Sequence, residues 1–117
     1  MAHLGSDGGA IFNPDAFIDN NLKLGIDLTA RYRVPAIYGG GGVSARAGCL
    51  ITYNLDWLAQ FHQIAPYLDR ILRGENPADL PVQAPTKFQY GINLKTAKAL
   101  GLTVPLAMQM TADEVIE

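Results

Sequence analysis

The sequence has a single cysteine, no long apolar run and no cluster of basic residues. Cys49 stands alone among 117 residues, so neither an intrachain disulfide nor a cysteine metal site can form. Its sequence neighbours are apolar, which indicates a small buried side chain rather than a reactive thiol. No apolar run reaches the length of a membrane span, so the sequence predicts no transmembrane helix.

The sequence also lacks a basic cluster and a recognisable targeting signal. The net charge is −2, and the lysines and arginines are scattered, which argues against a nucleic-acid-binding protein. The start, Met1–Gly9, is small and polar rather than basic and then apolar, so no secretory signal peptide is expected in it. We interpret residues 1–9 as an unstructured or cloning-derived start.

No set of residues is spaced for catalysis or for metal binding. His3 lies in the polar start and His62 on an expected helix, and neither has a partner at the spacing of a metal site or a catalytic triad. The carboxylates are spread along the chain and form no acid–base pair. We therefore expect no enzyme activity, no metal and no cofactor.

What the sequence does contain is the composition of one small globular domain. Hydrophobic residues make up 49% of it and the mean hydropathy is +0.09, which is enough for a modest core. Apolar runs predict strands at residues 10–12, 34–38, 49–53 and 86–93. Helical periodicity predicts helices at 15–33, 54–73 and 94–100, with a short helix or turn at 43–47. We expect no domain boundary within the chain.

This order of elements predicts an α/β fold, an open and mainly parallel sheet with flanking helices. The apolar run at 49–53 is typical of a parallel strand covered on both faces. Pro66 lies inside the long helix and is expected to kink it or to remove a hydrogen bond. In the tail, Thr111 and Glu114 have the spacing of a capping box.

Ligands of such sheets bind beyond the carboxyl ends of the strands. The polar residues at these ends are our candidate ligand-binding residues. The set consists of Asn13, Asp15, Tyr53, Asn54 and Asp56.

Most of these candidates also have a structural interpretation. Tyr53 could stack on a ligand or anchor its strand end, and Asp56 could contact a cationic group or cap a helix. Asn13 and Asp15 fit either a ligand contact or a turn stabilised by their side chains. The glycine run 39–42 could cradle a phosphate, but it lacks the G-x-G-x-x-G order and the lysine of a P-loop, so a mobile loop is the favoured interpretation.

Several segments resemble one protein family over nearly the whole chain after Asn13. The chain is similar to the C-terminal third of bacterial ABC-transporter substrate-binding proteins whose characterised relatives bind tryptophan and similar amino acids. The segments are Pro35–Tyr38, Ala47–Tyr53, Tyr67–Gly74, Pro77–Gln83, Pro85–Phe88, Ile92–Pro105 and Ala112–Glu117.

The resemblance implies one lobe of a type I periplasmic-binding-protein fold, flavodoxin-like and incomplete in this chain. In that family a small solute lies between two lobes, and the closed form delivers it to a membrane permease outside the cytoplasm. Three positions depart from the family pattern, because Cys49 and Asn54 replace glycines and Thr52 replaces a serine. The glycine run 39–42 also stands where the family has a more substantial loop.

Three functions remain open at this point. The first is a fragment of a solute-binding protein of an ABC importer, with a small solute such as an amino acid and a permease as partners. The second is a small flavodoxin-like protein that binds a nucleotide or phosphate at the glycine run. The third is an assembling remnant without a ligand. Exposed apolar surface on a lone lobe favours a homodimer, and exchange of the strand–helix unit at 86–100 is one arrangement of it.

Overall fold

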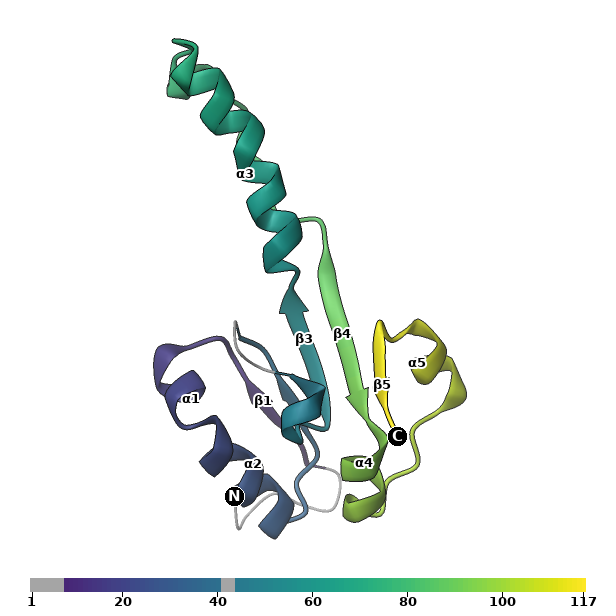
Figure 1. Cartoon of the computed structure of the whole chain (residues 1–117). Coiled ribbons are helices and arrows are strands. Elements are labelled where there is room, and N and C mark those ends of the chain that lie inside the picture. Colours follow the sequence, from purple (N-terminus) through teal and green to yellow (C-terminus); the bar gives the residue numbers. More distant parts are fainter. Residues whose placement is uncertain (1–7, 41–43) are drawn as a thin grey trace. The chain divides into compact units, whose positions relative to one another are not determined.

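The computed structural model describes residues 8–40 and 44–117 (Figure 1). The chain divides into two compact units, whereas we expected no internal boundary. One unit consists of the described residues up to Asn54 and from Gln89 onwards, and we call it the sheet unit. The other consists of Leu55–Phe88, and we call it the helix unit. Most of the predicted start and part of the glycine run lie outside the described residues.

The sheet has five strands in the order β1-β2-β3-β4-β5. The strands β1, β2 and β3 are parallel to one another, and β4 is parallel to β5. The arrows of β3 and β4 point in opposite directions in Figure 1. The predicted open, mainly parallel sheet is therefore confirmed, with a reversal in its middle and a fifth strand that the sequence did not predict. The strands are β1 (Ala10–Phe12), β2 (Ala36–Tyr38), β3 (Ile51–Leu55), β4 (Phe88–Asn93) and β5 (Glu114–Ile116).

The first predicted helix is in fact two. α1 (Ala16–Asn20) and α2 (Leu22–Arg31) are separated at Asn21, whose ψ of 20° departs from helical values. The Asn21 side-chain amide donates to the carbonyl of Phe17 at 2.8 Å, which satisfies a carbonyl at the end of α1. Asparagine side chains commonly bond to nearby backbone groups in this way, and such bonds favour a break over a continuous helix.

The core lies on one face of the sheet. The rings of Phe12 and Tyr38 stack with their centroids 4.7 Å apart, and the Tyr38 hydroxyl bonds to that of Thr29 on α2 at 2.8 Å. The opposite face carries a row formed by Ile11, Ile37 and Ile51 in register across three strands. Ile11 is 77% exposed.

The expectation that β3 is covered on both faces is therefore wrong. Thr52 is buried, whereas Ile51 and Tyr53, which alternate with it and point to the other face, are partly or largely exposed. Apolar composition alone does not distinguish such a strand from a doubly covered one.

The C-terminal half of the sheet unit is joined to β3 by close contacts. A Cβ atom at Gly91 of β4 would lie 2.6 Å from the Thr52 hydroxyl, so this position accepts no side chain. Asn93 donates to the carbonyl of Ala45 at 2.8 Å and caps α4 (Leu94–Leu100) through Thr96 N–H at 2.9 Å. Ala45 begins a short 3₁₀ helix, Ala45–Ala47, in the region where a short helix or turn was predicted.

The tail forms α5 (Leu106–Thr111) and then β5, rather than a single helical turn. The predicted capping box is wrong, because Thr111 is the last residue of α5 and its hydroxyl donates to the carbonyl of Met108. Glu114 instead begins β5, which pairs with β4 from Gly91 onwards. The long-range pairing with β4 overrides the local helical signal.

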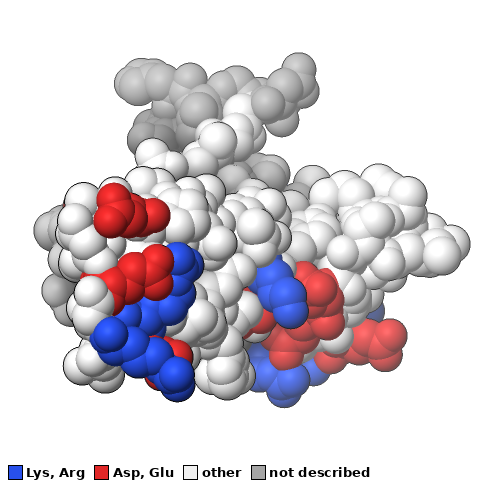
Figure 2. All heavy atoms as spheres, turned by 90° about the horizontal axis from the view of Figure 1, so that it is seen from above, with Lys and Arg blue, Asp and Glu red and all other residues white. Residues whose placement is uncertain are grey.

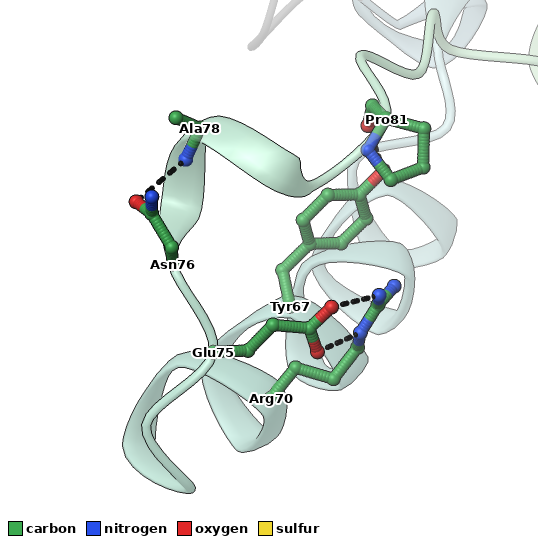
Figure 3. Close-up of polar contacts among 6 residues, drawn as sticks. All are labelled: Tyr67, Arg70, Glu75, Asn76, Ala78 and Pro81. Carbon is green, nitrogen blue, oxygen red and sulfur yellow. Dashed lines mark hydrogen bonds and ion pairs between the residues drawn. The ribbon is translucent and has the colours of Figure 1, made fainter.

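The helix unit consists of α3 (Trp57–Leu72) and the segment that follows it, which includes the 3₁₀ helix Pro77–Asp79. α3 continues through Pro66 as one helix. Figure 3 shows how polar contacts hold the following segment: Arg70 pairs with Glu75 through two bonds, and the Tyr67 hydroxyl donates to the carbonyl of Pro81.

Candidate ligand-binding edge of the sheet

Three strand ends meet at one edge of the sheet unit. Because β1, β2 and β3 are parallel, their carboxyl ends lie on the same side. Gly39, just after β2, donates its N–H to the carbonyl of Phe12 at 2.9 Å. A Cβ atom at Gly39 would lie 3.2 Å from the Pro14 ring and 3.5 Å from the carbonyl oxygen of Tyr53. Gly39 therefore brings the ends of all three strands into contact.

Asn54 fixes the loop that follows β2. Its side-chain oxygen accepts a hydrogen bond from the N–H of Gly40 at 2.8 Å. Gly40 has a φ of 146°, a conformation that favours glycine. The N–H groups of both Gly39 and Gly40 thus have protein acceptors, which counts against the phosphate cradle that was the less favoured interpretation of this run. The remaining residues of the run, 41–43, lie outside the described structure.

Asn13 and Asp15 flank Pro14 at the end of β1, and both are exposed. One carboxylate oxygen of Asp15 accepts the Phe17 N–H at 2.7 Å and caps α1. This bond bears out the structural interpretation of Asp15, and it leaves the second oxygen of the carboxylate for another donor. The contact between Pro14 and Gly39 places both residues at the same edge as the end of β2.

Tyr53 is 51% exposed and contributes its backbone to the contact with Gly39. Asp56 is different, because it belongs to the helix unit. Its carboxylate accepts the Ala59 N–H at 2.9 Å and caps α3, as its structural interpretation predicted. The structure therefore brings Asn13, Asp15, Tyr53 and Asn54 to one edge of the sheet unit.

A stacked aromatic pair, the buried Tyr38 and the partly buried Phe12, lies beneath this edge, and the sequence analysis missed it. Phe12 and Tyr38 are the last residues of β1 and β2, and they are register partners. Burial raises the pKa of the Tyr38 hydroxyl, although its bond to Thr29 acts in the opposite direction. The sequence signal was present in the aromatic residue at the end of each run, but pairing them requires the strand register.

Cys49 is fully buried beside this pair, and burial raises the pKa of its thiol to about 11. A thiol that remains protonated and covered is a poor nucleophile, so the predicted structural role is confirmed. It contributes to packing beneath the edge rather than to chemistry at the surface.

A hollow lies between α2 and α4 in the sheet unit. Its volume is about 290 Å³, and its lining is mostly apolar. The apolar part of its wall includes Ile26, Ala30 and Leu100. Its polar lining residues include Thr29, Tyr38 and Lys95. This cavity is an alternative place for a small ligand, and experiments on the edge must distinguish the two.

The face drawn in Figure 2 carries no patch of a single charge. Figure 2 shows acidic and basic side chains intermixed on the face that it draws, with a large uncharged area beside them. Across residues 8–40 and 44–117, no group of three or more His, Cys, Asp or Glu side chains is placed to hold a metal ion. In the same residues, no helix is long and apolar enough to cross a membrane.

Two solved structures share the fold of this chain. A conserved domain protein from Vibrio cholerae O1 biovar El Tor matches with a TM-score of 0.77 and 24% identity over 90% of this chain. An ABC domain from Streptococcus pneumoniae in complex with L-Trp matches with a TM-score of 0.78 and 25% identity over 95% of this chain. A search of curated proteins finds no match.

This chain covers only 35% and 38% of the lengths of those two structures, so it spans little more than a third of each. The family model for ABC transporter substrate-binding proteins matches residues 1–116, which is nearly the whole chain. The strand-end edge, the α/β sheet and this match agree with the resemblance noted from the sequence, and the chain belongs to the ABC transporter substrate-binding protein family.

Proposed function

We propose that this chain contributes one wall of the solute site of an ABC importer's binding protein, and that the solute is an amino acid. The observation that carries the proposal is the contact of three strand ends at Gly39, with Asn54 fixing the adjacent loop. Family membership and the L-Trp complex of a structural neighbour support the same class of ligand.

The chemistry of the edge suits an amino acid. The half-exposed Tyr53 ring offers an apolar surface on which an aromatic side chain could stack, and stacking geometries of this kind are favourable. The second oxygen of the Asp15 carboxylate can accept a hydrogen bond from an ammonium group, and the Asn13 amide can donate one to a carboxylate group. Asp56 lies in the helix unit, where its cap of α3 leaves one carboxylate oxygen available, and its ligand role stays a prediction.

In this proposal the complete protein works outside the cytoplasm and delivers its solute to a membrane permease, without turnover. Solute selects a closed arrangement of two lobes because it contacts both of them. A chain that supplies one wall leaves the other side of the solute in water. We therefore expect weak binding, with a Kd on the order of 1 mM.

NMR titration of the isotope-labelled 117-residue chain with L-tryptophan tests this proposal. We expect chemical-shift changes at residues 13–15, 39–40 and 53–54. The substitution Tyr53→Ala should lower the affinity for L-tryptophan at least about fivefold. Lys95→Ala, at the rim of the α2–α4 cavity, is the matched control and should leave the affinity unchanged.

Two results would count against the proposal. Shifts confined to the α2–α4 cavity would move the site away from the edge. The absence of any shift at 10 mM L-tryptophan, roughly ten times the expected Kd, would remove aromatic amino acids as the solute class.

A further inference from the structure

The α2–α4 cavity of the sheet unit has a volume of about 290 Å³. Its lining includes Ala36 and Tyr38 of β2, which are both buried, and residues of the two helices. Ala30 of α2 and Ala99 of α4 are exposed at its mouth and contribute only methyl groups, which leaves the space between the helices unfilled. An apolar cavity of about 150 Å³ holds a molecule of the size of benzene, so this one has room for roughly ten non-hydrogen atoms.

The hydroxyl groups that line the cavity already have protein partners. The Thr29 hydroxyl lies 2.9 and 3.0 Å from two carbonyl oxygens of its own helix. Because a carbonyl only accepts, Thr29 donates within α2, and the Tyr38 hydroxyl donates to Thr29 at 2.8 Å. The Thr96 hydroxyl donates to the carbonyl of Gly48 at 2.9 Å. None of these hydroxyl hydrogens is left for a ligand, so the interior of the cavity suits an apolar group.

The rim of the cavity carries a positive charge. Among the described residues that line it, Lys95 of α4 is the only charged one. Lys95 is exposed, and it forms no ion pair with any residue in the described part of the chain. Its ammonium group has three hydrogens to donate. An unpaired ammonium beside an apolar hollow favours a molecule with an apolar body and an anionic head.

We infer that the α2–α4 cavity binds a small apolar carboxylate, with the apolar body between the helices and the carboxylate on the Lys95 ammonium. The hydroxyl groups determine this orientation. The Tyr38 oxygen has only lone pairs to offer and would repel a carboxylate beside it, whereas the Lys95 ammonium attracts one at the rim. At the rim the carboxylate also keeps contact with water, which avoids the large cost of burying a charge.

One ammonium matches a head group with a single negative charge. No second Lys or Arg lines the cavity among the described residues, so a doubly charged phosphate would be only partly neutralised. The lining shares no residue with the strand-end edge. The inference is therefore independent of the proposed solute site, and either can fail without the other.

NMR titration of the isotope-labelled 117-residue chain with octanoate tests the inference. Octanoate has about ten non-hydrogen atoms, and we expect a Kd on the order of 0.5 mM for a ligand of this size. Chemical-shift changes should appear at residues 26–30, 48–50 and 95–100, and not at the edge residues 13–15 and 53–54. Octylammonium, which has the same tail and the opposite charge, should bind at least about tenfold more weakly.

Substitutions of lysine test the contact with the carboxylate. Lys95→Ala should lower the affinity for octanoate about fivefold, because an exposed charge-assisted bond is lost. Lys98→Ala removes the same charge from an exposed position of α4 that does not line the cavity, and should change the affinity less than about twofold. Lys95→Glu should make octylammonium the tighter of the two ligands, and Lys98→Glu should not.

A larger side chain at the mouth tests the position of the tail. Ala99→Leu places additional carbon atoms in the cavity and should lower the affinity for octanoate at least about tenfold. Lys98→Leu introduces the same side chain outside the cavity and should change the affinity less than about twofold. Leucine is a good helix former and both positions are exposed, so both variants should fold, which circular dichroism checks.

Three results would overturn the inference. The first is the absence of chemical-shift changes at 10 mM octanoate, roughly twenty times the expected Kd. The second is a set of changes confined to the edge residues, which would place octanoate at the strand ends. The third is equal affinity for octanoate and octylammonium, or equal effects of Lys95→Ala and Lys98→Ala, since Lys95 would then not select an anion.

Discussion

The sheet unit and the helix unit are stabilised by different interactions. The largest fully buried side chains, Tyr38, Ile92 and Cys49, all belong to the sheet unit. The helix unit is held by polar contacts at the end of α3, chiefly the pair of Arg70 and Glu75. Apolar burial is worth more than exposed ion pairs, so the two units should differ in stability.

This difference between the units bears on where a ligand site can lie. A ligand site needs side chains held by a rigid support, which the sheet unit supplies through buried contacts beneath its edge. The helix unit instead leaves large apolar side chains of α3 exposed, among them Leu58, Phe61 and Leu72. Substitutions that act on one unit and not on the other therefore test the assignment.

The largest contrast should come from removing apolar side chains. Ile92 is fully buried in the sheet unit, so Ile92→Ala should lower the free energy of unfolding by about 3–4 kcal/mol. Val82 of the helix unit is fully exposed, and Val82→Ala should change it by less than about 0.5 kcal/mol. Urea denaturation followed by near-ultraviolet circular dichroism measures both. Equal costs would show that the two units share one core.

A second contrast concerns glycines that are required for different reasons. Gly91→Ala brings a methyl group against the Thr52 hydroxyl and the Ala45 side chain. It should lower the free energy of unfolding by about 2–3 kcal/mol. Gly74 of the helix unit has open space around it, but its φ of 96° is unfavourable for alanine. Gly74→Ala should therefore lower the free energy of unfolding by only about 1 kcal/mol. The double substitution Gly91→Ala with Thr52→Ser leaves the clash in place, because the hydroxyl remains, and should recover little stability.

Local signals predicted much of the fold. The short strand at 10–12 and the helix at 94–100 were predicted with their observed bounds, because an apolar run and the Gly101 stop are local signals. β5 was not predicted. Its three residues become a strand only through pairing with β4, which no short window of sequence contains.

The candidate site was predictable to a similar extent. The rule that ligands bind at the carboxyl ends of strands selected Asn13, Asp15, Tyr53 and Asn54, which the fold places at one edge. It also selected Asp56, since the rule cannot recognise that the chain enters another unit after Asn54. Its ligand role, like those of the other four, is still a prediction.

The third contrast uses alkaline pH and acts on the sheet unit. Burial raises the pKa of Cys49 from 9.0 to about 11 in the folded chain. Between these values the unfolded chain binds fewer protons than the folded chain, so the free energy of unfolding falls as pH rises. We expect a loss of about 2 kcal/mol between pH 8 and pH 11. Burial of Tyr38 contributes in the same direction.

Denaturation of Cys49→Ala at the same two pH values isolates the contribution of the thiol. The variant should retain only the part of the slope that belongs to Tyr38. A slope identical to that of the unchanged chain would show that Cys49 ionises equally in both states.

The smallest contrast lies at acidic pH and acts on the helix unit. The Arg70 guanidinium lowers the pKa of the Glu75 carboxyl below its usual value. A lowered pKa stabilises the fold above the carboxyl's unfolded pKa, and this contribution is lost as pH falls through the folded value. The pair is exposed, so its contribution should be slight, and carbon-detected NMR of the Glu75 carboxyl is a better measure than denaturation. Arg70→Gln should raise the Glu75 midpoint and leave the stability of the sheet unit unchanged. If the substitution also destabilised the sheet unit, the polar contacts of α3 would have to support both units, and the division between them would fail.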